Sequence, residues 1–389
     1  MVFIKKIINK KKNKIAVIGL GYVGLPLAVE FSKKLEVVGY DYNSERINEL
    51  KTSYDRTNEI KNKNLLRNAN LSFTSKLSDV ANSNIFIVAV PTPVNKKKEP
   101  DLSLLKKACK SIGKFLKKND IVIFESTVYP GTTEEVCVPI LEKISSLTFN
   151  DDFYCGYSPE RMNPGDRKHN VTNIVKIVSG SSPKTKKFIF QLYSMIVSAG
   201  VHKVSSIKVA EAAKIIENTQ RDLNIALMNE LSIIFRMMNI DTYEVIDAAS
   251  TKWNFIKFHP GLVGGHCIGV DPYYLTFKSK QLGYEPKIIS AGRKLNDDMG
   301  NYVSKSMIAE MEKKIGSKKK YHILILGYTF KENCNDYRNT KVADIYNYFS
   351  ELLHSVEVYD PKIDFRKCDD LKEINFIKKI KKKYDGIII

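Results

Sequence analysis

The chain of 389 residues is longer than one ordinary hydrophobic core can serve, and its hydrophobic fraction of 43% is enough to build two or three cores. The net charge of +19 comes almost entirely from lysines spread along the chain, with no basic motif interleaved with aromatic residues, which argues against a nucleic-acid partner. The six cysteines form neither a CxxC pair nor a regular framework, which excludes a disulfide scaffold and leaves a metal site without support.

The first predicted elements are a strand, a turn and a helix in KIAVIGLGYVGLPLAVEF (14–31). The lysine-rich stretch before them looks like the start of a signal peptide. Three glycines at fixed spacing, a proline and the lack of a small-residue cleavage site argue against that interpretation. We therefore expect a cytoplasmic protein with no membrane span.

The turn carries a dinucleotide-binding pattern. Gly19, Gly21 and Gly24 form G-x-G-x-x-G, and VVGYDYN (37–43) is a second strand that ends in Asp41. The glycines permit the turn, the approach of a pyrophosphate and helix packing, while the acid binds the ribose hydroxyls. No arginine follows immediately to receive a 2′-phosphate, which favours NAD over NADP. A packing turn without a cofactor is the structural alternative.

Polar residues follow two further predicted strands, in NIFIVAVPTP (84–93) and DIVIFESTVYPGTTEE (120–135). Ligands of open parallel sheets sit beyond the carboxyl ends of the strands, where Thr92, Ser126 and Thr127 fall. The alternative is that Thr92 is a turn residue before proline and that the other two cap a helix.

The segment FYCGYSPERMNPGD (153–166) begins like a strand and ends in a polar loop. Its charged residues Glu160 and Arg161 have two possible interpretations, as members of a functional site or as ordinary surface charges. The sequence pattern indicates that the first domain ends near residue 205.

Residues 208–239 contain neither glycine nor proline and predict the longest helix. Glu211, Lys214, Asn218 and Arg221 form one polar stripe on an otherwise apolar helix. A solvated face is the plain interpretation. So much apolar surface predicts a helix buried nearly all round, and then the stripe lines a cavity or an interface.

A loop rich in glycine and aromatic residues follows, WNFIKFHPGLVGGHCIGVDPYYL (253–275), and its backbone can come close to a ligand. Residues 321–361 then repeat the opening pattern of strand, glycine, helix, strand and acid, with Gly327 and Asp360. This predicts a second Rossmann-like domain with a changed loop. Because a parallel strand needs a cover, the terminal YDGIII indicates an incomplete C-terminal domain.

Seven segments together resemble the NAD-dependent nucleotide-sugar 6-dehydrogenases, the UDP-glucose and UDP-N-acetylhexosamine dehydrogenase superfamily, over essentially the whole chain. They are GLGYVGLPLA, VPTP, ESTVYPGTT, YSPERMNPGD, the helix with Lys214 and Asn218, GGHCIGVDPYYL and LGYTFKENCNDYR. Two of them, YSPERMNPGD and HCIGVDPYYL, are similar to the branch that acts on UDP-N-acetylglucosamine or UDP-N-acetylgalactosamine. UDP-glucose enzymes typically have serine and lysine where this chain has His266 and Val270.

The resemblance implies an α/β fold with two Rossmann-like, doubly wound domains joined by a long central helix. Residues 1–205 would form the NAD-binding domain, 206–300 a central helical domain with the catalytic loop, and 301–389 a UDP-binding domain. It also implies a homodimer through the central helix and a product used for surface polysaccharide such as capsule or O-antigen.

The implied reaction is the four-electron oxidation of C6 of the sugar to a uronic acid, with two NAD as hydride acceptors. Cys267 would hold the intermediate aldehyde as a thiohemiacetal and then as a thioester. Asp271, with a water held by Asn218, would remove the hydroxyl proton, and Lys214 would stabilise oxyanion charge. Thr127 would place the hydrolytic water and Glu160 would assist the acid and base steps.

The resemblance also implies two sets of binding residues. Those for the cofactor are Gly19, Gly21, Tyr22, Val23, Gly24, Asp41, Arg46, Thr92, Ser126, Thr127 and Arg338. Those for the substrate are Glu160, Arg161, Lys214, Asn218, Phe255, Gly264, Tyr273 and Lys331. His266 receives no catalytic role.

Three other functions stay open at this point. One is a UDP-glucose 6-dehydrogenase, and another is a two-electron dehydrogenase of the β-hydroxyacid type, which would not need Cys267. The third is a silent NAD-binding regulator. The sequence also leaves the choice between the glucosamine and galactosamine epimers open.

Overall fold

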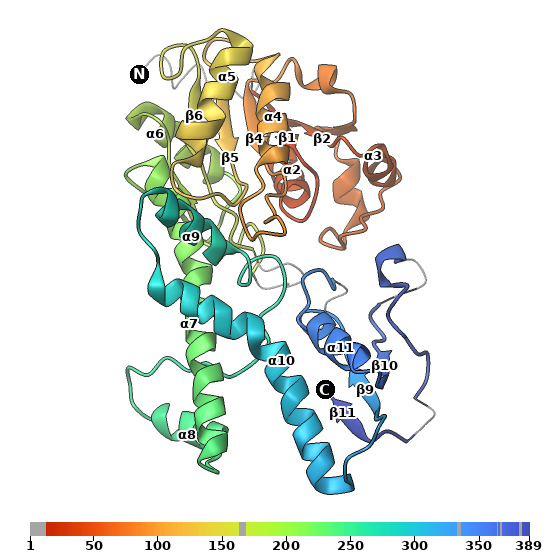
Figure 1. Cartoon of the computed structure of the whole chain (residues 1–389). Helices are drawn as coiled ribbons and strands as arrows, with labels where there is room; N and C mark the ends of the chain where they lie inside the picture. Colours follow the sequence, from red (N-terminus) through yellow and green to blue (C-terminus); the bar gives the residue numbers. More distant parts are fainter. Residues whose placement is uncertain (1–12, 163–168, 333–335, 364, 366–367, 381–382) are drawn as a thin grey trace. The chain divides into compact units, whose positions relative to one another are not determined.

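The computed structural model describes residues 13–162, 169–332, 336–363, 365, 368–380 and 383–389 (Figure 1). They divide into two compact units. The first holds the described residues up to 216 together with 273–278, and the second holds 217–272 and the described residues from 279 onward. The three-part division expected from the sequence stays a prediction.

The first unit is built on a six-stranded parallel sheet with the strand order β3-β2-β1-β4-β5-β6. The strands are β1 (Lys14–Ile18), β2 (Glu36–Tyr40), β3 (Leu71–Thr74), β4 (Ile85–Val88), β5 (Ile121–Phe124) and β6 (Tyr154–Tyr157). This order is that of a doubly wound dinucleotide-binding sheet, so the predicted fold class is confirmed. The central strands are nearly all apolar because they are buried on both faces.

Helices of the first unit cover this sheet (Figure 1). They are α2 (Gly24–Ser32), α3 (Ser44–Lys51), α4 (Ser103–Gly113), α5 (Val138–Ser145) and α6 (Pro183–Tyr193). Side chains of α2 and α6 share one hydrophobic cluster with Ile15 and Val17 of β1, and α4 packs against α5. A small parallel pair, β7 (Lys176–Val178) and β8 (Val201–Lys203), completes the unit.

The long predicted helix is confirmed as α7 (Ile207–Met237). Within the single chain this helix is not buried nearly all round, because Leu227, Ile234 and Met237 are 50%, 43% and 82% exposed. Sequence patterns count apolar residues on a helix but do not show what covers them. Three further helices follow α7 along the chain, namely α8 (Thr242–Ala249), α9 (Asp271–Gln281) and α10 (Lys287–Ile315).

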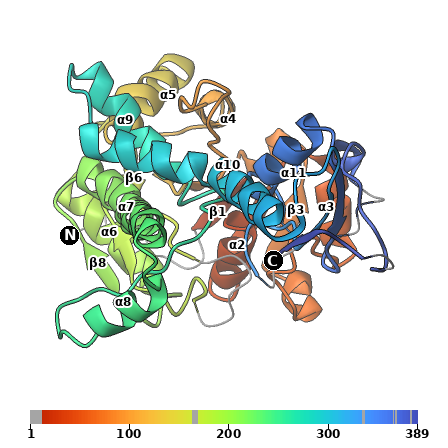
Figure 2. The same ribbon diagram turned by 60° about the horizontal axis from the view of Figure 1, so that its bottom comes forward.

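The second unit contains a three-stranded parallel sheet in the order β10-β9-β11, with β9 (His322–Leu326), β10 (Ser355–Tyr359) and β11 (Gly386–Ile388). Helix α11 (Val342–Glu351) lies between β9 and β10 in the chain and packs against α10 (Figures 1 and 2). Gly327 follows β9 with a φ of +92°, as Gly19 follows β1 with +93°. The predicted repeat of the Rossmann-like opening is therefore confirmed.

Candidate functional site

The glycine turn after β1 is shaped by steric limits. A Cβ on Gly24 would lie 1.8 Å from the Gly19 carbonyl oxygen, and one on Gly19 would lie 2.7 Å from the Ala89 carbonyl oxygen. Neither position can accept a side chain. A Cβ on Gly21 would meet nothing within 4 Å, so this backbone faces open space at the start of α2. Such a turn before a helix N-terminus fits a pyrophosphate.

The acid after β2 closes this turn. Asp41 Oδ2 accepts a hydrogen bond from the Leu20 N–H at 2.9 Å, and Asp360 Oδ2 accepts one from the Tyr328 N–H at 2.7 Å in the second unit. Both Rossmann-like openings thus use a carboxylate to fasten the glycine turn to the second strand. Asp41 Oδ1 accepts the Asn43 N–H at 2.9 Å, so each carboxylate oxygen accepts one backbone hydrogen bond, and ribose binding by Asp41 stays a prediction.

Arg46 has a structural role beside the turn. It is 5% exposed, its Nε donates to the Leu20 carbonyl at 3.0 Å, and its Nη2 donates to Asp55 Oδ1 at 2.7 Å. Its predicted contact with a cofactor stays a prediction, as do those of the half-buried Tyr22 and Val23.

Two predicted residues tie the carboxyl ends of β4 and β5 together. Thr92 Oγ1 donates to the Thr127 carbonyl at 2.6 Å, and Ser126 Oγ donates to the Val90 carbonyl at 2.7 Å. Ser126 therefore braces the sheet edge and its hydroxyl is not a helix cap. The three residues lie at the edge where ligands of such sheets bind.

The loop after Thr127 is held by Glu211 of α7, which is fully buried. Its two carboxyl oxygens accept the backbone N–H groups of Gly131 at 2.6 Å and Thr133 at 2.9 Å. Burial raises the pKa of Glu211 to about 7, against the opposing effect of these hydrogen bonds. In the polar stripe of α7, this residue therefore fastens a loop.

We expect Glu211→Ala to lower the free energy of unfolding by about 2–4 kcal/mol at pH 6, because two buried N–H groups lose their acceptors and a cavity forms. Glu211→Gln should recover only part of this loss, because its amide oxygen can accept one of the two N–H groups while its NH2 group, a donor, faces the other. Since the folded-state pKa of Glu211 lies above its ordinary value of 4.5, its contribution is present below pH 4.5 and is lost as the pH rises through about 7. Urea unfolding at pH 6 and pH 8 measures both effects, and an unchanged alanine variant would contradict the assignment.

Glu160 and Arg161 are fixed by backbone contacts after β6. The Arg161 N–H donates to Glu160 Oε1 at 2.7 Å, and the Arg161 guanidinium donates to the Val175 carbonyl at 2.7 Å. Residues 163–168 of the same predicted loop lie outside the described residues. Lys214 lies on α7, is 7% exposed and is thus an almost fully buried cation, which needs compensating partners.

Cys267 is exposed and lies in a turn that leads into α9. Its carbonyl accepts the N–H groups of Val270 at 3.0 Å and Asp271 at 2.8 Å. Asp271 is 2% exposed, and its Oδ2 accepts Asn218 Nδ2 at 2.5 Å. The nucleophile candidate, the base candidate and its amide partner are therefore brought together within the second unit.

A second loop braces the cysteine loop. A Cβ on Gly264 would lie 2.8 Å from the Asn339 carbonyl oxygen, and one on Gly265, whose φ is +80°, would lie 2.7 Å from the Phe330 ring. The Gly265 N–H donates to the Asn339 carbonyl at 3.2 Å. Both glycines are therefore required by the protein's own packing.

His266 belongs to this brace. Its Nε2 lies 3.2 Å from Asp336 Oδ2, and the Arg338 guanidinium donates to both oxygens of the same carboxylate, at 2.9 and 2.6 Å. Burial favours the neutral acid, but the hydrogen bonds from Arg338 and His266 outweigh it and hold the pKa of Asp336 well below its usual value. The carboxylate thus connects the residue before Cys267 to a predicted cofactor-binding arginine.

The remaining predicted substrate residues have ordinary surroundings. Phe255 is half-buried, the Tyr273 ring lies 5.2 Å from Lys98 Nζ, and Lys331 Nζ lies 5.8 Å from the Phe330 ring. Their binding roles stay predictions. So does the assembly of the first-unit and second-unit residues into one site.

Sequence patterns missed a buried ionic cluster formed by Glu125, Lys176 and Tyr193 of the first unit. The Lys176 Nζ lies 2.5 Å from Glu125 Oε2, and the Tyr193 hydroxyl donates to Glu125 Oε1. One signal was available, namely a glutamate placed directly after the apolar strand run IVIF.

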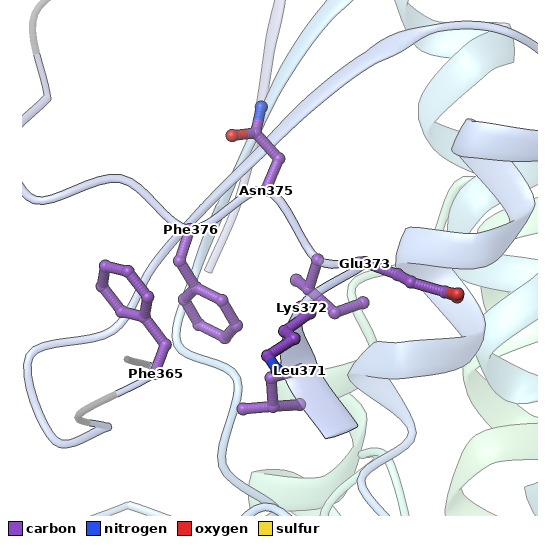
Figure 3. Close-up of a pocket in the computed structure, with 7 residues that line it drawn as sticks. Phe365, Leu371, Lys372, Glu373, Asn375 and Phe376 are labelled. Atoms are coloured by element: carbon purple, nitrogen blue, oxygen red, sulfur yellow. The ribbon is translucent and has the colours of Figure 1, made fainter. Parts of the chain in front are cut away.

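A pocket of about 540 Å³ in the second unit lies apart from the predicted residues. A single segment lines it, comprising Phe365, Leu371, Lys372, Glu373, Ile374, Asn375 and Phe376 (Figure 3). The two phenylalanine rings stack with centroids 5.1 Å apart. No predicted site residue lines this pocket. Within the described ranges, no helix is long and apolar enough to cross a membrane, and no cluster of His, Cys, Asp and Glu could hold a metal ion.

Three family models match consecutive parts of the chain. They are described as the NAD binding domain, the central domain and the UDP binding domain of the UDP-glucose/GDP-mannose dehydrogenase family, and they match residues 13–197, 208–298 and 324–389.

Known relatives match nearly as much of the chain. UDP-N-acetyl-D-glucosamine 6-dehydrogenase of Pseudomonas aeruginosa is 59% identical over 90% of this chain and 83% of its own length. The Salmonella typhi protein of the same name is 55% identical over 97% and 89%. The solved UDP-N-acetylmannosamine dehydrogenase from Pyrococcus horikoshii superposes with a TM-score of 0.84 at 32% identity, covering 90% of this chain and 84% of that one.

Proposed function

This chain belongs to the UDP-glucose/GDP-mannose dehydrogenase family, and from that premise we propose that it oxidises C6 of UDP-N-acetylglucosamine to the carboxylate with NAD. The observation that carries the proposal is the exposed Cys267 beside the bonded pair of Asp271 and Asn218, on a loop held by the protein's own packing. The two relatives named for this substrate support it at 59% and 55% identity.

The glycine turn and Asp41 would hold NAD, which accepts a hydride at each of the two oxidations. The open space at Gly21 and the helix that begins at Gly24 suit its pyrophosphate, and the Asp41 carboxylate suits ribose hydroxyls. Thr92 and Ser126 at the sheet edge, with Arg338 of the brace, complete the proposed cofactor contacts.

The first oxidation needs a base for the C6 hydroxyl proton. Asp271 takes this proton, directly or through a water held with Asn218, whose amide fixes the carboxylate. Lys214 stabilises the oxygen as negative charge develops on it. The carbon loses a hydride and the oxygen a proton, which leaves an aldehyde.

The second oxidation uses Cys267. Its thiolate adds to the aldehyde carbon and forms a carbon–sulfur bond, and the oxygen takes up a proton to give the thiohemiacetal. Loss of a second hydride and of that proton leaves a thioester on Cys267. The aldehyde therefore never leaves the enzyme.

Hydrolysis releases the product. Glu160 accepts a proton from a water placed by Thr127, the water oxygen attacks the thioester carbon, and the carbon–sulfur bond breaks to restore the thiolate. The sum is one alcohol, two NAD and one water giving one carboxylate, two NADH and three protons. The uronic acid product would serve surface polysaccharide synthesis such as capsule or O-antigen.

The remaining substrate contacts are assigned by chemistry. Arg161 and Lys331 supply positive charge for the diphosphate, and Phe255 and Tyr273 supply rings for uracil or sugar. Gly264 leaves the sulfur accessible. His266 and Val270 stand where UDP-glucose enzymes typically have serine and lysine, which disfavours UDP-glucose as the substrate. UDP-N-acetylgalactosamine is the second candidate, because it differs only at C4.

Counting NADH per sugar tests the function. We expect two NADH for each UDP-N-acetylglucosamine consumed, with slower turnover of the galactosamine epimer and little of UDP-glucose. One NADH per sugar would support the two-electron β-hydroxyacid type instead. NAD binding without turnover of any of the three sugars would support a silent regulator.

We also propose that the chain forms a homodimer through α7 in the cytoplasm. Leu227, Ile234 and Met237 recur at helical spacing on α7, and Trp253 and Ile256 of the following segment are 91% and 66% exposed. An apolar row of this kind on a helix favours burial against a second copy.

Light scattering after gel filtration tests the dimer. Leu227→Glu combined with Ile234→Glu should convert the dimer into a monomer, because two charges would be buried in an apolar contact. Leu353→Glu, at a position 79% exposed after α11, should stay dimeric. A wild-type chain that is monomeric at micromolar concentration would rule the proposal out.

A further inference from the structure

A buried lysine lies between two carboxylates in the first unit. Lys176 Nζ is 2.5 Å from Glu125 Oε2 and 3.6 Å from Glu160 Oε2. The side chains of Lys176 and Glu125 are 4% and 0% exposed. Burying an ammonium is costly unless carboxylates compensate it, so these two groups determine where the lysine side chain lies.

The parallel sheet brings these residues together. Glu125 directly follows β5, Glu160 lies three residues after β6, and the two strands are neighbours. Tyr193, the last residue of α6, donates its hydroxyl to Glu125 Oε1, and its ring lies 5.5 Å from Lys176 Nζ. Glu125 thus has one oxygen bonded to the tyrosine and the other to the lysine, and it anchors Lys176.

The two oxygens of the Glu160 carboxylate have different surroundings. Its Oε1 accepts the backbone N–H groups of Arg161 and Met162. Its Oε2 is buried and accepts no hydrogen bond from any residue in the described part of the chain. The Lys176 ammonium faces this oxygen at a distance longer than a hydrogen bond, so the interaction is electrostatic.

We propose that Lys176, anchored by Glu125 and Tyr193, is a positioning residue whose buried charge holds the Glu160 carboxylate in place for thioester hydrolysis. This inference rests on the proposed role of Glu160. The proposal gives a function to the buried Lys176 ammonium, which takes no part in the two hydride transfers.

Removing the lysine would leave two carboxylates in one buried place. Burial already raises the pKa of Glu125 to about 7, with Lys176 opposing the rise and Glu160 adding to it. Without the ammonium, no cation would face the buried Glu160 oxygen whether or not Glu125 is charged, so Glu160 would take up a proton or turn away from its present position. Either change would remove the base from the hydrolysis step and leave Cys267 chemistry unaffected.

Rapid mixing of Lys176→Met with NAD and UDP-N-acetylglucosamine tests this. We expect a burst of two NADH per site at close to the wild-type rate, followed by steady turnover slowed by about 10²-fold, which is the scale of a general base contribution. Intact-protein mass spectrometry should find the uronoyl adduct on the stalled enzyme. The KM for the sugar should stay within about threefold.

Further variants separate positioning from folding. Glu125→Gln combined with Lys176→Met removes the second carboxylate, so the melting temperature should recover while turnover stays low. In a Glu160→Gln background, Lys176→Met should slow turnover little further, because the base is already absent. Lys176→Arg keeps a cation and should stay within about tenfold of the wild type.

Three results would overturn the inference: a folded Lys176→Met enzyme within about threefold of wild-type turnover, a loss confined to the NADH burst, or turnover that recovers together with the melting temperature in the double variant. Failure of the wild type to form two NADH per sugar is a separate result. It would remove the proposed function whatever the variants do.

Discussion

Cys267→Ala is expected to lower NADH formation from UDP-N-acetylglucosamine by about 10³-fold or more. Without the thiolate, the aldehyde has no covalent acceptor. Oxidation then stops after one hydride at an unfavourable equilibrium. The variant should still contain Asp271, Asn218 and the cofactor turn, so its first oxidation should remain.

An aldehyde trap makes that remaining step visible. With a hydroxylamine-type trap present, Cys267→Ala should accumulate one NADH per sugar, whereas the wild type without a trap forms two. Cys368→Ala, at a half-buried cysteine of the same unit, is the matched control and should behave as the wild type. Two NADH per sugar from Cys267→Ala would show that the second oxidation does not need the Cys267 thiolate.

The parts predicted well from the sequence are those fixed by short segments. The turn after β1 needs glycine at 19 and 24 because a Cβ at these positions would lie 2.7 and 1.8 Å from a backbone oxygen, and such limits appear directly as a spaced pattern. The same holds for Gly327 and Asp360, where a single glycine and an acid indicated the second Rossmann-like opening.

Contacts between distant segments were beyond sequence reasoning. Lys176, the first residue of β7, and Glu125, the residue after β5, are 51 positions apart, and no periodicity predicts their contact. Glu211 shared a polar stripe with Lys214, yet its carboxylate fastens residues 131 and 133. The apolar face of α7 indicates that something covers it, but the pattern does not indicate whether the cover comes from the same chain.

The loop around Cys267 combines a feature predicted from a short segment with contacts between distant segments. Its glycines suggested a close approach of substrate, and the structure adds a second cause, since Asn339 and the Phe330 ring exclude any side chain at 264 and 265. The brace also gives His266 a partner in Asp336, a link across 70 positions. A loop fixed on both sides keeps the cysteine in one position, which covalent capture of an aldehyde requires.

Asp271→Asn should reduce kcat for UDP-N-acetylglucosamine by about 10²–10⁴-fold, the range for a general base. The amide keeps the size of the buried carboxylate, so Asn218 retains a partner at the end of its 2.5 Å hydrogen bond. The change removes the proton acceptor alone. Hydroxide must then take the C6 proton, and kcat should rise about tenfold per pH unit where the wild type is flat.

The nucleophile provides the internal control for this variant. Because Cys267 is exposed, its rate of alkylation can be measured, and in Asp271→Asn it should stay within about threefold of the wild type. Asp247→Asn, at a side chain 64% exposed in the same unit, should keep full activity. A kcat within tenfold of the wild type, or one independent of pH, would mean that a group other than Asp271 removes the proton. Loss of the hydride from C6 also requires loss of the hydroxyl proton, so that result would assign the general base to a different group. The role of Cys267 would be unaffected.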